Sequence, residues 1–250
     1  MTAHPHAGIG TRQSLLDPST YDMVMLQTSH GTQEILPATV EQMRRFTRET
    51  PSLPTLNAEP AYEGIMGVVG AATMRAAFWI SMLEGGCGHT YGAQGIWAMN
   101  SRYKPFRGTT SNWGDGWWQD AMHYAGSTDV GRSKKFLERW QWWRLVPRDE
   151  PSVAAMNRPT SLAAEIPGEA RFYYIPNANA PEEVRGSTVG WKGVLTPLAL
   201  EPGSRWRAFF WNPRTGDETE AVEAAPGTDG NWAPPSRPSM EDWVLCLVKN

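Results

Sequence analysis

The sequence predicts an α/β domain followed by an all-β domain, and two observations carry this prediction. Over the first 147 residues, short apolar runs alternate with helical patterns, which is typical of a parallel sheet covered by helices. After Pro147, short strand patterns are separated by turns rich in proline and glycine, with no helix pattern between them. With 250 residues, 40% of them hydrophobic, the chain is long enough to bury a core in each part.

The first part opens with a strand, a loop and a helix. Residues 21–27 (YDMVMLQ) form a nearly continuous apolar run, which is typical of a strand buried on both faces. Residues 39–49 (TVEQMRRFTRE) predict a helix that begins at Thr39 as its N-cap, with Gln42 three residues later. The apolar residues of this helix recur at helical spacing: Val40, Met43 and Phe46.

The same order then repeats along the chain. Residues 53–58 predict a second strand that ends at Glu59, and a long helix that stops at Gly85 and Gly86 follows it. The apolar stripe of this helix is formed by Ile65, Val69, Ala72, Ala76, Trp79 and Leu83. A third strand is expected around residues 87–91. Beyond a loop rich in glycine and tryptophan, helical segments are expected near residues 117–125 and 129–145.

The second part, residues 148–250, predicts an antiparallel β-sandwich. Its clearest strands are residues 171–175, 206–211 and 243–248, and residues 212–216 (NPRTG) predict a turn. Four tryptophans of this part are expected to pack in its core and at its edges: Trp206, Trp211, Trp232 and Trp243. The predicted domain boundary therefore lies after residue 147.

Charge and composition narrow the class of partner. The 23 basic and 26 acidic residues leave a net charge of −3 with no run of like charges, so the sequence carries no footprint for nucleic acid or an anionic membrane. No apolar run is long enough to cross a membrane, and residues 1–6 lack the pattern of a signal peptide. Cys87 and Cys246 are far apart and form no disulfide framework; a bridge stays open, but two buried thiols are the expectation.

Polar side chains gather where each predicted strand ends. They are His4, His6, Gln27, His30, Glu59, His89 and Tyr91. In a (β/α)8 barrel these points lie on one face, where the loops that follow the strands carry the chemistry. The four histidines of this set could suggest a zinc site, but no acidic ligand accompanies them, so neither a metal nor a cofactor is expected.

Several of these segments, in this order, resemble the apiosidase-like glycoside hydrolases. They are residues 2–5 (TAHP), 25–31 (MLQTSHG), 57–64 (NAEPAYEG), 88–92 (GHTYG) and 95–97 (GIW). Residues 211–216 (WNPRTG) and 242–245 (DWVL) resemble the family's C-terminal β-sandwich, which is labelled collagen-binding. The resemblance spans nearly the whole chain. No residue points to collagen itself, so we expect an accessory domain.

The resemblance implies that residues 1–147 are the C-terminal half of a (β/α)8 barrel, with strands five to eight ending at His4, Gln27, Glu59 and His89. The length agrees, because a full barrel needs about 250 residues. Glycoside cleavage needs two carboxyl groups. By the resemblance, Glu59 is the nucleophile and the general acid precedes Met1. We therefore expect a fragment with little or no activity alone.

The resemblance also implies which residues serve the sugar. The complete enzyme is expected to be a retaining O-glycosidase acting on side chains of plant polysaccharides, with full-length members secreted or periplasmic. The residues expected to bind its carbohydrate substrate are Gln27, His30, Tyr62, Glu63, His89, Tyr91 and Trp97. Each has a structural alternative: Glu63 suits the end of a helix, and each histidine suits a buried hydrogen bond. The tryptophans around the long loop, Trp97, Trp113, Trp117 and Trp118, are candidates for a sugar platform.

Two other functions stay open. The chain could be a non-catalytic carbohydrate- or protein-binding product, or, with less support, a metal-dependent barrel hydrolase. A half barrel leaves strand edges unpaired and apolar surface uncovered. The partners expected besides the sugar are therefore the missing N-terminal half barrel or a second copy that associates through exposed strand edges.

Overall fold

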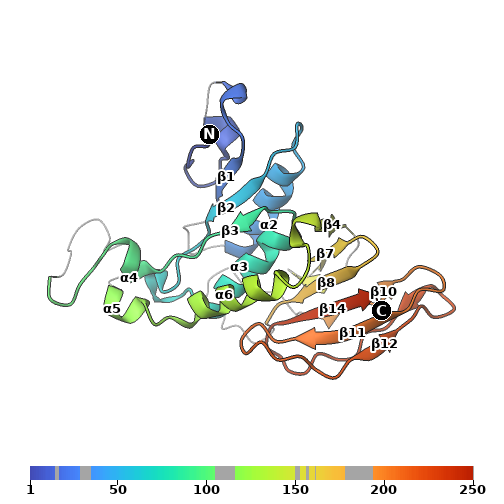
Figure 1. The fold of residues 1–250 in the computed structure, drawn as a ribbon. Helices are drawn as coiled ribbons and strands as arrows, with labels where there is room; N and C mark the ends of the chain where they lie inside the picture. Colours follow the sequence, from blue (N-terminus) through green and yellow to red (C-terminus); the bar gives the residue numbers. More distant parts are fainter. Residues whose placement is uncertain are drawn as a thin grey trace. The chain divides into compact units, whose positions relative to one another are not determined.

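The computed structural model describes residues 1–14, 17–28, 35–104, 116–149, 153–155, 158–160, 162–177 and 194–249. Helices and sheets are both well represented (Figure 1). Among the described residues the chain divides into two compact units, the first comprising Met1–Gly131 and the second beginning at Arg132. No helix in the described ranges is long and apolar enough to cross a membrane.

The first unit is built on a three-stranded parallel sheet in the order β1-β2-β3. Its strands are β1 (Val24–Gln27), β2 (Thr55–Glu59) and β3 (Gly88–His89), so the predicted parallel arrangement is confirmed. The connections contain α2 (Ile35–Thr47) and α3 (Ala71–Leu83). The shorter helices are α1 (Thr11–Ser14), η1 (Pro18–Thr20), η2 (Ile65–Gly67), α4 (Gln94–Trp97) and α5 (Trp118–Ala121); α6 (Ala125–Leu137) begins in this unit and ends in the second.

The two helices cover one face of this sheet. Val24 and Leu26 pack against Met43 and Phe46 of α2, and all four side chains are buried. Because strand residues point alternately to opposite faces, Met25 and Gln27 lie on the other face, where they are half-buried. Among the described residues, α2 and α3 therefore lie on one face of the sheet, and Met25 and Gln27 belong to the opposite face.

The prediction for the start of α2 was wrong. The helix begins at Ile35, and Thr39 lies inside it, where its hydroxyl donates to the backbone oxygen of Ile35 at 2.7 Å. A threonine inside a helix can bond back one turn in this way, so an N-cap residue type does not by itself mark the first turn. Pro37 did not prevent the earlier start, because proline is tolerated in the first turn.

The long helix predicted from Ile65 is also shorter than expected. Ile65 belongs to η2, and α3 begins only at Ala71. Gly64 and Gly67 have φ angles of 82° and 71°, and Met66 has a φ of 53°, which is the left-handed region that a right-handed helix cannot continue through. The end of the helix was predicted correctly: Gly85, with a φ of 88°, terminates it.

The second unit is antiparallel. Its main sheet has six strands in the order β12-β11-β14-β8-β7-β4, and two smaller sheets have the orders β6-β5-β9 and β10-β13. The strand bounds are β4 (Val146–Arg148), β5 (Val153–Ala155), β6 (Arg158–Thr160), β7 (Ala163–Ile166), β8 (Ala170–Ile175), β9 (Val194–Leu195), β10 (Leu198–Ala199), β11 (Trp206–Trp211), β12 (Val222–Ala224), β13 (Asn231–Trp232) and β14 (Trp243–Lys249). The three predicted strands correspond to β8, β11 and β14.

The core of the second unit is aromatic. Trp206, Trp211 and Trp243 are buried, as predicted, while Trp232 is half-buried. The C-terminal end of α6 joins this core, because Phe136 stacks on Trp211 with ring centroids 4.1 Å apart. The predicted helix over 129–145 instead ends at Leu137 and is followed by the short η4 (Trp142–Arg144). The predicted turn is present: Gly216 closes it by donating to the backbone oxygen of Asn212.

Both cysteines are free thiols. Cys246 is buried in β14 and Cys87 is half-buried before β3. Burial raises the pKa of each thiol, which keeps both in the neutral form at ordinary pH. The disulfide left open by the sequence is therefore absent, and Cys246 fits the expectation of a small buried side chain.

Candidate active site

A bulge in β2 decides which way Glu59 points. Leu26 is paired with Asn57, but the next pair joins Gln27 to Glu59, so Ala58 is an extra residue without a partner in β1. Without it, Glu59 would lie on the same face as Asn57, toward the helices. A bulge re-aims the side chains that follow it. Glu59 therefore lies on the same face as Gln27, opposite to α2 and α3, at the carboxyl end of the strand.

Tyr62 and His4 both hold the Glu59 carboxylate. The hydroxyl of Tyr62 donates to Oε1 at 2.7 Å, and Nε2 of His4 lies 2.8 Å from Oε2. Because a carboxylate only accepts, the Nε2 atom of His4 carries the proton. Burial, reinforced by the bond to Glu59, raises the pKa of Tyr62, so its hydroxyl remains a donor. The carboxylate side chain is 16% exposed, which leaves it accessible from one side.

Tyr62 is itself held between two neighbours. Its ring stacks against Trp97 with ring centroids 6.2 Å apart and an angle of 30° between the planes. The ring also packs on Gly92, where a side chain would collide with it. The indole N–H of Trp97 donates to Oε1 of the buried Gln94 at 2.8 Å. Trp97 is 48% exposed, so a fixed aromatic surface lies beside the residue that holds Glu59.

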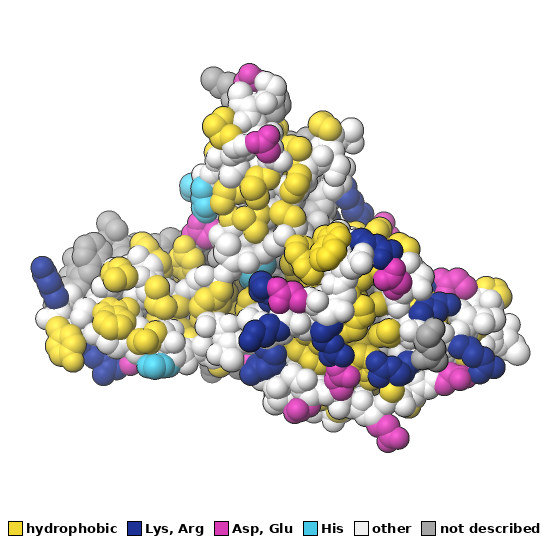
Figure 2. Space-filling model, in the orientation of Figure 1, with side chains coloured by type: hydrophobic (Ala, Val, Ile, Leu, Met, Phe, Trp, Pro, Cys, Tyr) yellow, Lys and Arg dark blue, Asp and Glu magenta, His cyan; other side chains and the backbone are white. Residues whose placement is uncertain are grey.

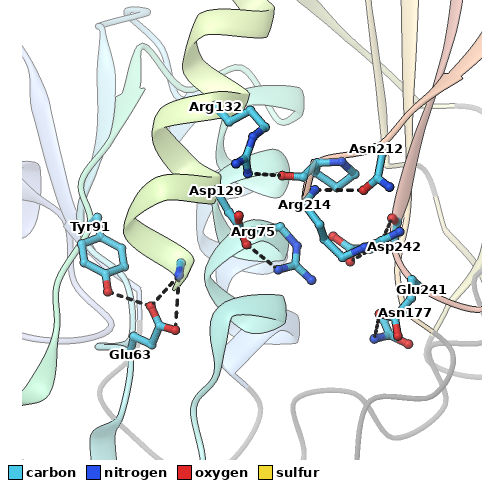
Figure 3. A network of polar contacts seen from close by, with 12 residues as sticks. Glu63, Arg75, Tyr91, Asp129, Arg132, Asn177, Asn212, Arg214, Glu241 and Asp242 are labelled. Atoms are coloured by element: carbon cyan, nitrogen blue, oxygen red, sulfur yellow. Dashed lines mark hydrogen bonds and ion pairs between the residues drawn. The ribbon is translucent and has the colours of Figure 1, made fainter. Parts of the chain in front are cut away.

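Glu63 has a different environment from Glu59. Its carboxylate is buried, accepts the hydroxyl of Tyr91 at 2.7 Å, and accepts the backbone N–H of Gly126 at 3.0 Å (Figure 3). Burial raises the pKa of Glu63, and burial together with Glu63 raises the pKa of Tyr91. Gly126 lies in the first turn of α6, where the helix has unpaired N–H groups. Glu63 therefore anchors the start of α6, which begins at Ala125, and not the start of the helix that follows Glu63 directly in the sequence.

His89 lies on the helix-covered face. It pairs in register with Asn57, and its Nδ1 atom is 3.3 Å from the hydroxyl oxygen of Ser81 in α3. That hydroxyl donates its one hydrogen to the backbone oxygen of Ala77 at 2.7 Å, so Nδ1 of His89 must be the protonated nitrogen. Its Nε2 atom is buried, and among the described residues none bonds it. Burial lowers the pKa of His89 to about 3, so the ring is neutral.

The family described as "Apiosidase-like, catalytic domain" matches residues 1–144, more than half of the chain. The chain belongs to the apiosidase-like family. No match was found among curated proteins.

Two solved structures share the fold of this apiosidase-like chain. One is described as a glycoside hydrolase family 5 protein from Bacteroides vulgatus and the other as a glycoside hydrolase. Each has a TM-score of 0.73 and 18% sequence identity, over 98% of this chain. The alignments cover 54% and 56% of those two structures. The apiosidase-like chain thus spans about half the length of the structures that it matches.

The structure brings together part of the predicted site. Glu59, Tyr62 and Trp97 are linked by direct contacts, and Gln27 lies beside Glu59 in the strand register. Tyr91 and Glu63 form a separate pair, and His89 lies on the opposite face of the sheet. His30 and Trp113 lie outside the described residues. Among the described residues, no group of three His, Cys, Asp or Glu side chains could hold a metal ion.

Sequence reasoning missed two contributors to this apiosidase-like site. His4 was placed at a strand end, but the residues around it form no strand, and its contact with Glu59 depends on how the N-terminal segment folds along β1. Gly92 carried no signal except its place in the GHTYG segment. Its role as the surface against which the Tyr62 ring packs requires the tertiary structure.

Gly92→Ala is expected to destabilise the protein by about 1–3 kcal/mol, because inserting a methyl group into a close contact forces its neighbours to move. The added Cβ would lie 2.1 Å from the Tyr62 ring. Thermal unfolding measures the effect. Gly131→Ala is the matched control: nothing lies within 4 Å of its Cβ position in α6, and alanine favours a helix. A Gly92→Ala protein as stable as this control would contradict the close packing of Tyr62.

His89→Asn is expected to reduce the loss of stability in acid. Asparagine keeps an N–H near the place of Nδ1 and removes the titrating ring. In the wild type, the pKa of His89 is about 3 in the folded protein and has its ordinary value of 6.5 in the unfolded chain. Between these two pH values only the unfolded chain binds a proton on this ring, so the folded state loses stability as the pH falls. The loss reaches up to about 1.4 kcal/mol per pH unit in the wild type.

Denaturant unfolding at pH 7 and pH 5 measures this difference. His6→Asn, at an exposed position, controls for the loss of a histidine. If His89→Asn loses as much stability between the two pH values as the wild type does, the buried neutral ring is the wrong description.

Proposed function

We propose that the complete protein is a retaining O-glycoside hydrolase that acts on side chains of plant-type polysaccharides, with Glu59 as the nucleophile. The observation that carries this proposal is the Glu59 carboxylate, which is accessible and is held by Tyr62 and His4 at the carboxyl end of a parallel strand. That end of a (β/α)8 barrel is where the catalytic residues lie. Membership of the apiosidase-like family and the fold shared with glycoside hydrolases support it.

In the proposed reaction, Glu59 attacks the sugar while Tyr62 and His4 hold its carboxylate. The carboxylate attacks the anomeric carbon, and the bond from that carbon to the leaving oxygen breaks while a general acid protonates that oxygen. The ester formed on Glu59 is then released by water. Tyr62 and His4 donate to both carboxylate oxygens, which orients the group before the attack.

The sugar pocket in this proposal centres on three side chains. Trp97 offers an aromatic face to the apolar side of a sugar ring, Gln27 offers an amide, and Tyr62 positions the nucleophile. Three predicted sugar ligands have a structural role in this proposal and do not contact the sugar. Glu63 and Tyr91 bond each other, and His89 faces Ser81 of α3. His30 remains a predicted sugar ligand from its place after β1.

We also infer that residues 1–147 form half of a (β/α)8 barrel and that residues 148–250 form an accessory β-sandwich. The general acid then comes from a part of the enzyme outside these 250 residues, on a strand of the other half barrel. A retaining mechanism requires it about 5 Å from Glu59. The extent of the match, about half of each solved structure, supports this division.

Activated substrates test the proposal without the general acid. A 2,4-dinitrophenolate group leaves without being protonated, so a panel of 2,4-dinitrophenyl glycosides reports nucleophilic attack alone. We expect at least one sugar of the panel to release dinitrophenolate faster than the uncatalysed rate. If no sugar reacts while the folded protein still binds one of them by calorimetry, the chain is a carbohydrate-binding protein, the second candidate that the exposed Trp97 favours.

A further inference from the structure

Exposed apolar side chains concentrate in one region of the first unit. Six of the thirteen exposed large hydrophobic residues in the described ranges come from two short segments, residues 96–103 and 118–122. Their exposed fractions run from 37% to 92%, and the residues are Ile96, Trp97, Met99, Tyr103, Trp118 and Met122. These six define the α4–α5 surface. Hydrophobic side chains are prominent on this part of the molecule in Figure 2. Clustering of this kind marks a binding surface.

The two segments are joined by several backbone and side-chain contacts. Gly95 packs on the backbone of Trp117 so closely that a Cβ would lie 2.5 Å from its carbonyl carbon. The backbone N–H of Trp118 donates to the backbone oxygen of Asn100 at 2.8 Å, and Gln119 donates to the hydroxyl of Ser101 at 3.2 Å. These contacts hold the backbones of the two segments against each other.

Trp97 joins this surface to the candidate active site. Its indole is fixed by Gln94 and stacks on Tyr62, which donates to Glu59. Ile96 precedes it in α4, and Met99 follows it two residues later. An aromatic and thioether surface thus begins beside the nucleophile and continues away from it.

The charge of the α4–α5 surface favours a neutral ligand. Arg102 and Asp120, one from each segment, form an ion pair, so their charges offset each other. Hydroxyl and amide groups of Ser101 and Gln119 lie among the apolar residues. Polysaccharides combine flat apolar ring faces with hydroxyl groups, which suits aromatic side chains interspersed with hydrogen-bonding groups.

We propose that the α4–α5 surface binds the main chain of a neutral polysaccharide, so that the sugar at Glu59 is removed from a polymer. This inference rests on the proposed function and adds to it a second, non-catalytic binding site. Trp97 contacts the sugar at Glu59, while Tyr103 and Trp118 contact units of the polymer further along.

Affinity gel electrophoresis tests the site directly. The probes are arabinoxylan, galactomannan and xyloglucan as neutral polymers, and polygalacturonate as an acidic one. We expect at least one neutral polymer to retard the protein, and Tyr103→Ala with Trp118→Ala to weaken its Kd by about tenfold for each ring removed. Trp143→Ala is the control, because this tryptophan is 67% exposed, against 37% for Trp118 and 92% for Tyr103, but lies in the second unit. Circular dichroism confirms that each variant is folded.

Kinetics separate this inference from the proposed function. Tyr103→Ala should leave turnover of the dinitrophenyl glycosides unchanged, while Glu59→Gln should abolish turnover and leave polymer binding unchanged. Absence of turnover with polymer binding intact defeats the proposed function alone. Failure to bind any neutral polymer, binding of polygalacturonate only, or equal binding by the variants defeats the inference. So does self-association of the wild type that these variants lose in sedimentation, since the surface would then join two copies.

Discussion

Glu59→Gln is expected to lower turnover of a reactive dinitrophenyl glycoside by at least about 1,000-fold, equivalent to about 4 kcal/mol of transition-state stabilisation. An amide has nearly the shape of the carboxylate but is a far poorer nucleophile. It can still accept the hydroxyl of Tyr62, so the packing around Trp97 should persist. The loss should therefore appear in turnover, with little change in the temperature of unfolding.

The control for this variant is Glu41→Gln, which removes an exposed carboxylate from α2. It should leave both turnover and stability unchanged. A Glu59→Gln protein that retains more than a few per cent of the wild-type rate would show that the nucleophile is another group. A variant that fails to fold would be replaced by Glu59→Ala with added azide, where recovered turnover identifies the missing carboxylate.

Asp129→Ala is expected to destabilise the protein by about 3–5 kcal/mol, the largest stability effect that the structure predicts. Asp129 in α6 and Arg75 in α3 form an ion pair with a distance of 2.7 Å, and their side chains are only 8% and 6% exposed (Figure 3). Removing the carboxylate leaves a buried guanidinium without its main counter-charge. Hydrophobic replacement of both partners should be milder, because no charge then remains buried.

Chemical denaturation measures this loss of stability, and hydrogen exchange shows whether the loss is located in α3 and α6. Glu138→Ala is the matched control, because Glu138, the residue after α6, pairs with Lys134 of that helix at an exposed position. Such surface pairs contribute about 0.5 kcal/mol or less. If Asp129→Ala and Glu138→Ala have similar effects, the Arg75 pair is not the internal tie between α3 and α6 that its burial indicates.

Much of the element order could be predicted because it depends on local sequence. Residues 206–211 read as a strand, and β11 has these bounds, since an aromatic and apolar run between turn residues has few other stable conformations. The end of α3 at Gly85 was predictable for the same reason. The first residues of the helices were harder to predict. Thr39 has the side chain of an N-cap, but it lies inside the helix, where its hydroxyl donates to the backbone oxygen of Ile35.

The site depended on information that is not local. Strand alternation alone would place Glu59 on the same face as Asn57, toward the helices. Only the pairing with β1 reveals the bulge at Ala58, which moves the Glu59 side chain to the opposite face. His89 ends a strand as Glu59 does, yet it faces Ser81 because no bulge intervenes. The assignment of Glu59 came from the resemblance to the family rather than from periodicity, and its contact with His4 appears only in the folded chain.

Mass spectrometry of the protein after reaction with a 2-deoxy-2-fluoro dinitrophenyl glycoside shows directly whether Glu59 is the nucleophile. The fluorine slows release of the glycosyl group, and the activated leaving group dispenses with the general acid. We expect a mass increase of one fluorosugar, located by peptide mapping on Glu59 and absent from Glu59→Gln. An adduct on another residue, or an adduct that persists in Glu59→Gln, would contradict it.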